Sequence, residues 1–311
     1  MHRPTPNLPL LSIAFALVFG ACEAPLAQQS AGPTAAATMA SATATSVATI
    51  APGATPRASS IPSPEATATA VQALDHCSGA PSLGMGTSVR AASTWAGYVA
   101  AQPPGSVSCV EASWVEPTVT CGTASAAVSV WVGIGAYDSV DLGIQDVGHP
   151  IQQAGTGVDC QGGHAEHYAW HQFLPRDSTD HPFRTPAGGH DLVVEPGDRM
   201  WAQVRYTGTA FVMSVANLSS GDVRSTTQKA AGRHRSSAEW VVSGEAVEPI
   251  ARFSAVTFTG GLVTLGGIVG PIGAATWNRN RIDEWAGDVK RLRVSTLSPV
   301  GDAFRVVWLH G

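Results

Sequence analysis

The chain has 311 residues, of which 44% are hydrophobic and 13% are charged, and its formal net charge is −5. This length allows a large hydrophobic core, and the mild negative charge gives no footprint for nucleic acid, so we expect no nucleic-acid partner. The 33 glycines and 21 prolines favour a turn-rich, all-β domain.

Residues 1–22 have the features of an export signal. A short, weakly basic start precedes the apolar run LPLLSIAFALVFGA over residues 8–21. That run is too short to span a bilayer comfortably and has the usual length of the hydrophobic part of a signal peptide. Cys22 follows at once, and VFGAC is similar to a bacterial lipoprotein cleavage motif, except that Phe19 stands where Leu is preferred. We therefore expect an extracytoplasmic protein, either freely secreted or anchored to the cell surface through a lipidated Cys22.

Residues 23–73 consist almost entirely of Ala, Thr, Ser, Pro and Gln, and no aromatic residue occurs between Phe19 and Trp95. Such a segment cannot bury enough apolar surface to offset the entropy lost on ordering. It predicts a flexible linker that leads into one domain over residues 74–311. An activation propeptide is the alternative, but a folded propeptide normally has an apolar periodicity, which this segment lacks.

Four cysteines remain after Cys22, an even number in an exported chain, and they predict two disulfides. Four cysteines allow three pairings. The sequence CVEASWVEPTVTC suggests a strand, a turn and a return, which favours the pair Cys109–Cys121 and leaves Cys77–Cys160.

From Trp95 onward, short runs rich in Val, Trp, Phe and Thr alternate with turn signals such as EPGD at 195–198 and SSGD at 219–222. None of these runs shows the 3.6-residue apolar repeat of a capped helix. The clearest predicted strands cover residues 128–135, 167–174, 191–206, 210–218, 238–244, 253–261 and 303–309. Strands that recur at this spacing without helices predict a β-sandwich or a barrel.

Glu239 lies in one of these strands, within the sequence SSAEWVVSGE. Strand alternation places Glu239 and Val241 on one face, and Ala238, Trp240 and Val242 on the other. Taken alone, this pattern indicates an ordinary carboxylate on the solvent side of an amphipathic strand.

Other kinds of catalytic site find little support. His164, His167 and His171 occur in HAEHYAWHQFL, which is typical of a strand. Residues four apart on a strand are about 13 Å apart, too far for one zinc ion with bonds of about 2.1 Å. The GxSxG motif of serine hydrolases and the DTG and DSG motifs of aspartic peptidases are absent. We expect neither a metal site nor an organic cofactor.

Eight segments, taken in order, resemble the glutamic peptidases, the eqolisin family. They are STWAGYVA, VEASWVEP, VWVGIG, IQQAGTGVDC, HYAWHQFLP, VEPGDRMWAQV, SSAEWVV and FSAVTFT, and the resemblance runs from about Trp95 to Pro271. It implies a sandwich of two antiparallel sheets, similar to the concanavalin-type lectins. It also implies an acid-active endopeptidase with a catalytic pair of one Gln and one Glu.

The family's AEW motif falls on Glu239, and its glutamine motif falls on Gln153 within IQQAG. The resemblance implies that Glu239 takes the proton of the attacking water and then protonates the departing amine. It implies that the Gln153 amide donates to the oxyanion while its carbonyl holds the water. We expect apolar neighbours such as Trp131 or Trp240 to raise the pKa of Glu239 by desolvation.

Four further residues are candidates for substrate binding. Tyr168, Trp170 and Gln172 share one face of their predicted strand, opposite the histidines, and the family has a Glu where this chain has Gln172. Trp131 belongs to the VWVGIG strand. The alternative for each tryptophan is packing in the core.

Two departures from the family pattern concern the catalytic glutamine. Gly135 stands where fungal members often carry Asp, and an extra segment, 136–149, precedes the glutamine motif. That segment contains Gln145, a second candidate for the catalytic amide. Gln145 precedes Asp146, whose negative charge is unfavourable beside an oxyanion, so we favour Gln153.

The competing interpretation is a catalytically inactive or carbohydrate-binding β-sandwich on a cell-surface stalk, since fold does not fix function. Calcium-dependent lectins cluster Asp and Asn ligands in loops, and the inserted segment offers only Asp138, Asp141 and Asp146. We expect a monomer whose partners are protein or peptide substrates.

Overall fold

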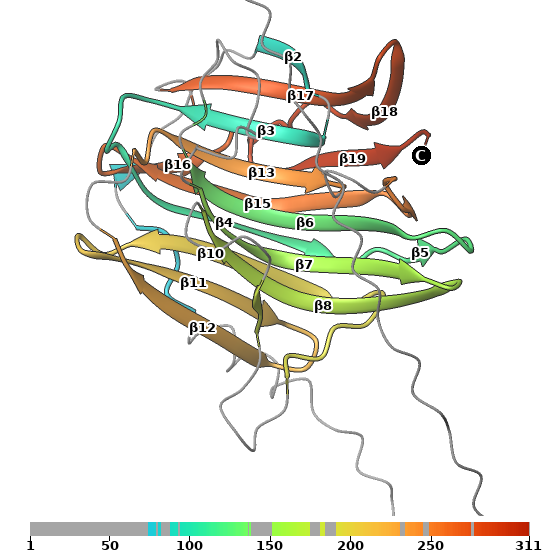
Figure 1. The fold of residues 1–311 in the computed structure, drawn as a ribbon. Helices are drawn as coiled ribbons and strands as arrows, with labels where there is room; N and C mark the ends of the chain where they lie inside the picture. The colour runs from blue at the N-terminus through green and yellow to red at the C-terminus, as the bar shows by residue number, and fades with distance from the viewer. Residues whose placement is uncertain are drawn as a thin grey trace, which may run out of the picture. The chain divides into compact units, whose positions relative to one another are not determined.

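Figure 1 shows the fold in a computed structural model of the chain. The structure describes residues 74–78, 80–81, 88–92, 94–135, 137, 151–174, 181–183, 191–230, 234–244, 249–274 and 277–310. The predicted signal peptide with Cys22, the predicted linker and, apart from Tyr137, the inserted segment with Gln145 lie outside these ranges, so those interpretations stay predictions.

Strands and turns make up the described chain, in agreement with the prediction of an all-β fold. The strands are β1 (Ala80–Pro81), β2 (Ser88–Ala92), β3 (Trp95–Ala101), β4 (Val107–Val115), β5 (Val119–Thr120), β6 (Ala126–Gly135), β7 (Gln152–Gln161), β8 (His164–Phe173), β9 (His181–Pro182), β10 (Arg199–Tyr206), β11 (Ala210–Asn217), β12 (Asp222–Lys229), β13 (Ser237–Ser243), β14 (Arg252–Phe253), β15 (Val256–Leu265), β16 (Ile268–Pro271), β17 (Asn278–Ala286), β18 (Val289–Val294) and β19 (Phe304–Trp308). Within the described ranges there is no helix long and apolar enough to cross a membrane.

The strands form two layers. The front sheet has the order β2–β17–β3–β13–β6–β7–β8–β9, and its central strands run side by side in Figure 1. The back sheet has the order β12–β11–β10–β4–β15–β16–β1. The first residues of β15 pair with β19, which continues through β18 to β17 and joins the two sheets along one edge. The architecture is thus the predicted sandwich, antiparallel except where β1 meets β16 and β2 meets β17.

The main core lies between the sheets and is built by strand alternation. Ala238, Trp240 and Val242 of β13 face it, and Trp240 also donates from its indole Nε1 to the backbone oxygen of Glu111 in β4, at 2.9 Å. This bond satisfies a buried indole donor while its ring fills the core. A second, smaller apolar cluster covers the other face of the front sheet, and it includes Val241.

The turn predictions agree with the structure, and one strand is shorter than predicted. Of residues 191–206, only β10, from 199 onward, is a strand, because Asp198 N–H donates to Glu195 O at 3.0 Å and closes a turn over EPGD. Several long strands were not among the clearest predictions, including β7, β12 and β17, whose sequences, QQAGTGVDCQ, DVRSTTQK and NRNRIDEWA, are too polar for the usual strand signal.

Both described disulfides differ from the predicted pairs. Cys77 is bonded to Cys109 and Cys121 to Cys160, so the predicted pairs Cys109–Cys121 and Cys77–Cys160 are wrong. The supposed hairpin does not form, because β4 pairs with β10 and β15 and not with a returning strand. The chain instead continues past Cys121 into β6, where Ala126 pairs with Cys160.

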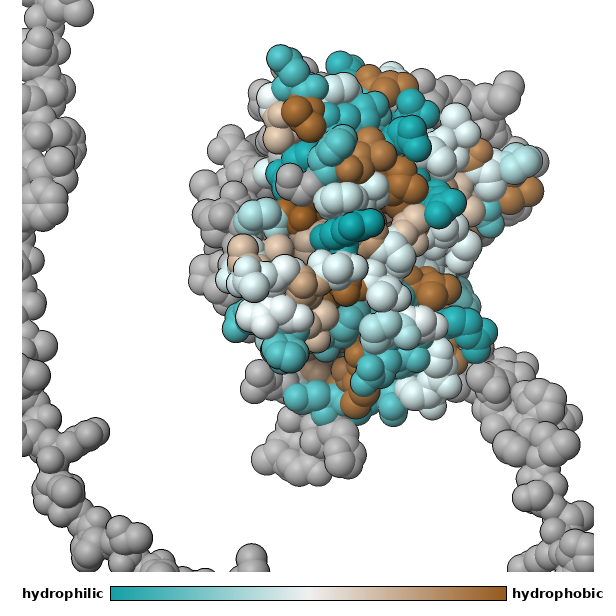
Figure 2. Space-filling model, turned by 90° about the vertical axis from the view of Figure 1, so that its right-hand side faces the viewer, coloured by the Kyte–Doolittle hydropathy of each residue, from teal (hydrophilic) through white to brown (hydrophobic). Residues whose placement is uncertain are grey.

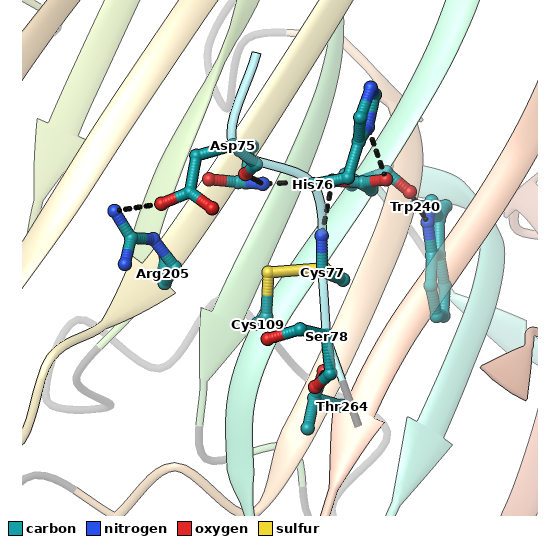
Figure 3. Close-up of a disulfide and its surroundings, with 10 residues drawn as sticks. Asp75, His76, Cys77, Ser78, Cys109, Arg205, Trp240 and Thr264 are labelled. Atoms are coloured by element: carbon teal, nitrogen blue, oxygen red, sulfur yellow. Dashed lines mark hydrogen bonds and ion pairs between the residues drawn. A yellow bond between two sulfur atoms is a disulfide. The ribbon is translucent and has the colours of Figure 1, made fainter. Parts of the chain in front are cut away.

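The segment Asp75–Ser78 is fastened to the outer face of the back sheet (Figure 3). The buried carboxylate of Glu111 accepts from the backbone N–H of Cys77 at 3.0 Å and from Gln203 Nε2 at 2.8 Å. The Cys77–Cys109 disulfide adds a covalent link. The N-terminal end of the described domain is therefore attached to the outer face of the back sheet. The apolar cluster that contains Val241 lies on the opposite side of the sandwich.

Exposed apolar side chains are scattered among polar ones. The large ones among the described residues are Val89, Val115, Val193, Val223, Val289 and Val300. Figure 2 shows brown residues interspersed with teal ones over one side of the molecule. Single exposed valines are normal on a soluble protein and indicate no docking surface.

Candidate active site

Glu239 and Gln153 lie in one row that crosses the front sheet. Glu239 of β13 pairs with Gly133 of β6, and Gly133 pairs with Gln153 of β7. Gln153 pairs in turn with Gln172 of β8. Directly paired residues point to the same side of an antiparallel sheet, so the carboxyl and both amides share one face. We call it the Glu239 face; it is the side turned away from the back sheet.

Gly133 separates the carboxyl from the first amide and contributes no side chain to the gap. Strands are about 4.8 Å apart, so the Cα atoms of Glu239 and Gln153 are about 10 Å apart. A Cβ atom at Gly133 would lie 3.0 Å from the Trp131 ring and 3.2 Å from the Ile151 side chain. The row therefore needs a glycine here, because the Trp131 and Ile151 side chains pack over this position.

Gly135 also shapes the surroundings of the carboxyl. A Cβ atom at this position would lie 3.0 Å from Glu239 Oε1 and 3.5 Å from its Cδ. The Glu239 carboxyl therefore extends over Gly135 and occupies space that a side chain there would need. An Asp at this position, as in fungal members of the family that the sequence resembles, could not be added without moving Glu239.

Glu239 is fully buried, so the interpretation as a solvent-facing carboxylate is wrong. Neither of its oxygens has a hydrogen-bond partner of good geometry among the described residues. Burial raises the pKa of Glu239 to about 8, and the Ser237 hydroxyl opposes this shift by a smaller amount. The direction agrees with the prediction, but Trp240 is not the cause, because its ring lies in the core on the other side of the sheet.

Ser237, Tyr137 and Trp95 surround the same face and were not predicted. Ser237 is buried two residues before Glu239, and its Oγ accepts from the backbone N–H of Tyr137 at 2.9 Å. The Tyr137 ring meets Trp95 of β3 edge-on, with ring centroids 6.3 Å apart. Alternation along β13 could have indicated Ser237, whereas no sequence signal pointed to Tyr137.

Gln153 and Gln172 are joined directly. Gln153 Nε2 donates to Gln172 Oε1 at 2.5 Å, and both side chains are nearly buried, with exposed fractions of 8% and 9%. The structure therefore places Gln172 against the predicted catalytic amide.

The three aromatic candidates also lie on the Glu239 face. Trp131 pairs with Val241 and with Gly155, and Gly155 pairs with Trp170, so a glycine separates the two indoles. Both indoles lie two residues along their strands from the row of Glu239, Gly133, Gln153 and Gln172, which we call the polar row. Both are nearly buried and belong to the smaller apolar cluster, with Tyr168 packed against it. Packing and substrate contact are compatible for residues in this position.

The histidines of β8 are arranged as the strand prediction requires. His167 faces the opposite side from Tyr168, and its Nδ1 lies 2.8 Å from Glu116 Oε1. The other oxygen of Glu116 accepts from Thr156 Oγ1 at 2.7 Å. This buried network links β7 and β8 to the residue that follows β4, and it stands apart from the polar row.

Comparisons with known proteins agree with this architecture. Scytalido-glutamic peptidase, solved with a peptide-based transition-state analogue, superposes with a TM-score of 0.53 at 23% identity, covering 70% of this chain and 98% of that chain. SCP-B, an Eqolisin family member solved with the tripeptide Ala-Ile-His, gives 0.51 at 21% identity with the same coverage. At these identities the likeness shows the fold.

The family comparison is more specific. No curated protein matches the sequence. The model of the peptidase A4 family matches residues 93–296, more than half of the chain, and the match includes Gln153 and Glu239. This chain belongs to the peptidase A4 family.

Proposed function

We propose that this protein is an exported, acid-active endopeptidase that uses Glu239 and Gln153 to hydrolyse peptide bonds with water as the nucleophile. The observation that carries the proposal is the row in which Glu239, Gly133 and Gln153 are paired in register, with both functional side chains on the same face of the sheet. Membership of a peptidase family supports protein or peptide substrates. The two disulfides support an extracytoplasmic location.

The proposed chemistry needs one carboxyl and one amide. Glu239 takes a proton from water as the water oxygen attacks the scissile carbonyl carbon, and an N–H of Gln153 donates to the resulting oxyanion. Glu239 then gives the same proton to the amide nitrogen as the C–N bond breaks, and the carboxylate is regenerated. We propose no metal or organic cofactor for either step.

The raised pKa of Glu239 constrains this scheme. With a pKa of about 8, the enclosed carboxyl is almost fully protonated at acid pH and is a poor base there. Activity in acid therefore requires that water and substrate enter the site and solvate the carboxyl, which lowers its pKa toward the ordinary value of 4.5. Neither oxygen has a hydrogen-bond partner of good geometry among the described residues, so both can accept from that water.

Three neighbouring aromatic residues, Trp131, Tyr168 and Trp170, are proposed to contact the substrate. They lie on the Glu239 face beside Gly155 and Gly157, and the Tyr168 ring packs over Gly157. Flat rings beside the polar row suit an extended peptide, which offers side chains to the rings and amide groups to the polar row.

A metal-independent cleavage assay tests the proposal against a lectin-like module. The full chain is incubated with a denatured protein over pH 2–8, with and without EDTA. We expect cleavage in acid, unaffected by EDTA and by serine- or thiol-directed reagents, and an ascending limb of kcat, which reports the substrate-bound enzyme, with an apparent pKa near 4. A limb near 8 would contradict acid activity, and the absence of cleavage at any pH would favour the binding module.

A further inference from the structure

The amide of Gln153 is already held by a neighbour before any substrate is present. Its Nε2 donates to Gln172 Oε1 at 2.5 Å, between two nearly buried side chains on adjacent strands. A free glutamine side chain rotates about its last torsion, which is broad. This bond fixes that rotation.

The direction of the bond also decides which end of the amide faces Glu239. The strand order is β13, β6, β7, β8, so Gln172 lies on the far side of Gln153 from Glu239. The bond draws the Gln153 nitrogen toward β8. Because the amide is planar, its carbonyl oxygen points away from β8, on the side of the proposed catalytic water. The second N–H of Gln153 remains available to an oxyanion.

We propose that Gln172 is a positioning residue, which orients the Gln153 amide for water binding and oxyanion donation instead of binding substrate itself. This inference rests on the proposed roles of Glu239 and Gln153. An amide at position 172 carries no charge at any working pH, so it accepts from Gln153 without adding a negative charge near the developing oxyanion.

Two substitutions separate positioning from a purely structural role. Gln172→Met keeps the length and apolar packing but cannot accept the bond. We expect kcat to fall about tenfold with KM within about twofold, a smaller loss than the hundredfold or more that follows removal of an oxyanion donor. Gln172→Glu can still accept, so kcat should stay within about threefold of wild type in acid, where the new carboxyl is protonated. It should then fall as the pH rises and that carboxyl ionises.

Glu166→Gln is the matched control, because Glu166 is an exposed residue of the same strand β8. It should leave kcat, KM and the pH profile unchanged. Glu239→Gln is measured in parallel: if it stays active, the proposed function fails, whatever Gln172 does.

The positioning role is overturned in three cases, provided that Glu239→Gln is inactive. In the first, Gln172→Met keeps wild-type kcat. In the second, it raises KM alone, which would indicate direct substrate binding. In the third, Gln172→Glu follows the wild-type pH profile. If Gln172→Met fails to fold, the pH profile of Gln172→Glu decides.

Discussion

Replacing Glu239 with Gln is expected to stabilise the folded protein at neutral pH. The pKa of Glu239 is about 8 in the folded protein, because of burial, against 4.5 for the ordinary carboxyl. Below pH 4.5 the carboxyl is protonated in both the folded and the unfolded chain, so the folded state pays no charge penalty. Between pH 4.5 and about 8 only the unfolded chain ionises, and the free energy of unfolding falls as the pH rises.

The size of this effect follows from the shift. Each pH unit in that window lowers the free energy of unfolding by about 1.4 kcal/mol, which amounts to about 3 kcal/mol by pH 7. A glutamine does not ionise, so the variant avoids this loss. For a domain of this size, 1 kcal/mol corresponds to about 2–4 °C in Tm, so Glu239→Gln should raise Tm by roughly 6–12 °C at pH 7 and hardly change it at pH 4.

Thermal unfolding of both proteins by circular dichroism, at intervals from pH 4 to pH 8, measures the difference. Burial also raises the pKa of Glu284, to about 7, so its ionisation lowers the free energy of unfolding in the same direction. Glu284 is present in both proteins, so its effect cancels in the Tm difference. The exposed Glu166→Gln variant controls for the loss of a carboxyl. A Tm difference that is the same at pH 4 and pH 7 would refute the argument from burial.

Three further results are expected. Gly135→Ala should lower kcat about tenfold or more, because its Cβ would lie 3.0 Å from Glu239 Oε1. Gly122→Ala is the control and should be neutral, because nothing lies within 4 Å of the Cβ position there. Equal kcat values for the two variants would contradict this prediction. Gln153→Ala should lower turnover about a hundredfold or more and Gln145→Ala only a few-fold, and the reverse order would show that Gln145 is the catalytic amide. Ser237→Ala should raise the pKa of Glu239 further, because the serine hydroxyl lowers it, and so move the ascending limb of kcat to higher pH; an unmoved limb would contradict that role.

The sequence predicted two members of the polar row, Glu239 and Gln153, but not their alignment across the sheet. The resemblance pointed to Glu239 and Gln153, and alternation placed Glu239 on the face opposite Trp240, whereas no face was predicted for Gln153. The register that aligns them through Gly133 is set by pairing between strands far apart in the chain, and sequence periodicity carries no information on such pairing. For the same reason the contact between Gln153 and Gln172 was not predicted.

The disulfides show a second limit. The predicted pair Cys109–Cys121 rested on a local hairpin pattern, whereas the partners of β4 come from β10 and β15. The extended segment at residues 75–78 has no strand signal, yet it crosses the back sheet and brings Cys77 to Cys109. Local patterns recover strands well, and they do not say which strands or segments meet.

The most direct test of the proposed function is the turnover of Glu239→Gln on a denatured protein substrate in acid, with folding checked by circular dichroism. The carboxyl must accept and return a proton, and an amide can do neither. We therefore expect the variant to fold and to retain no more than a few per cent of wild-type kcat. This loss is in line with the roughly 10²–10⁴-fold contribution of general acid–base catalysis. A folded variant with turnover close to that of the wild type would contradict the assignment of Glu239 as the catalytic carboxyl.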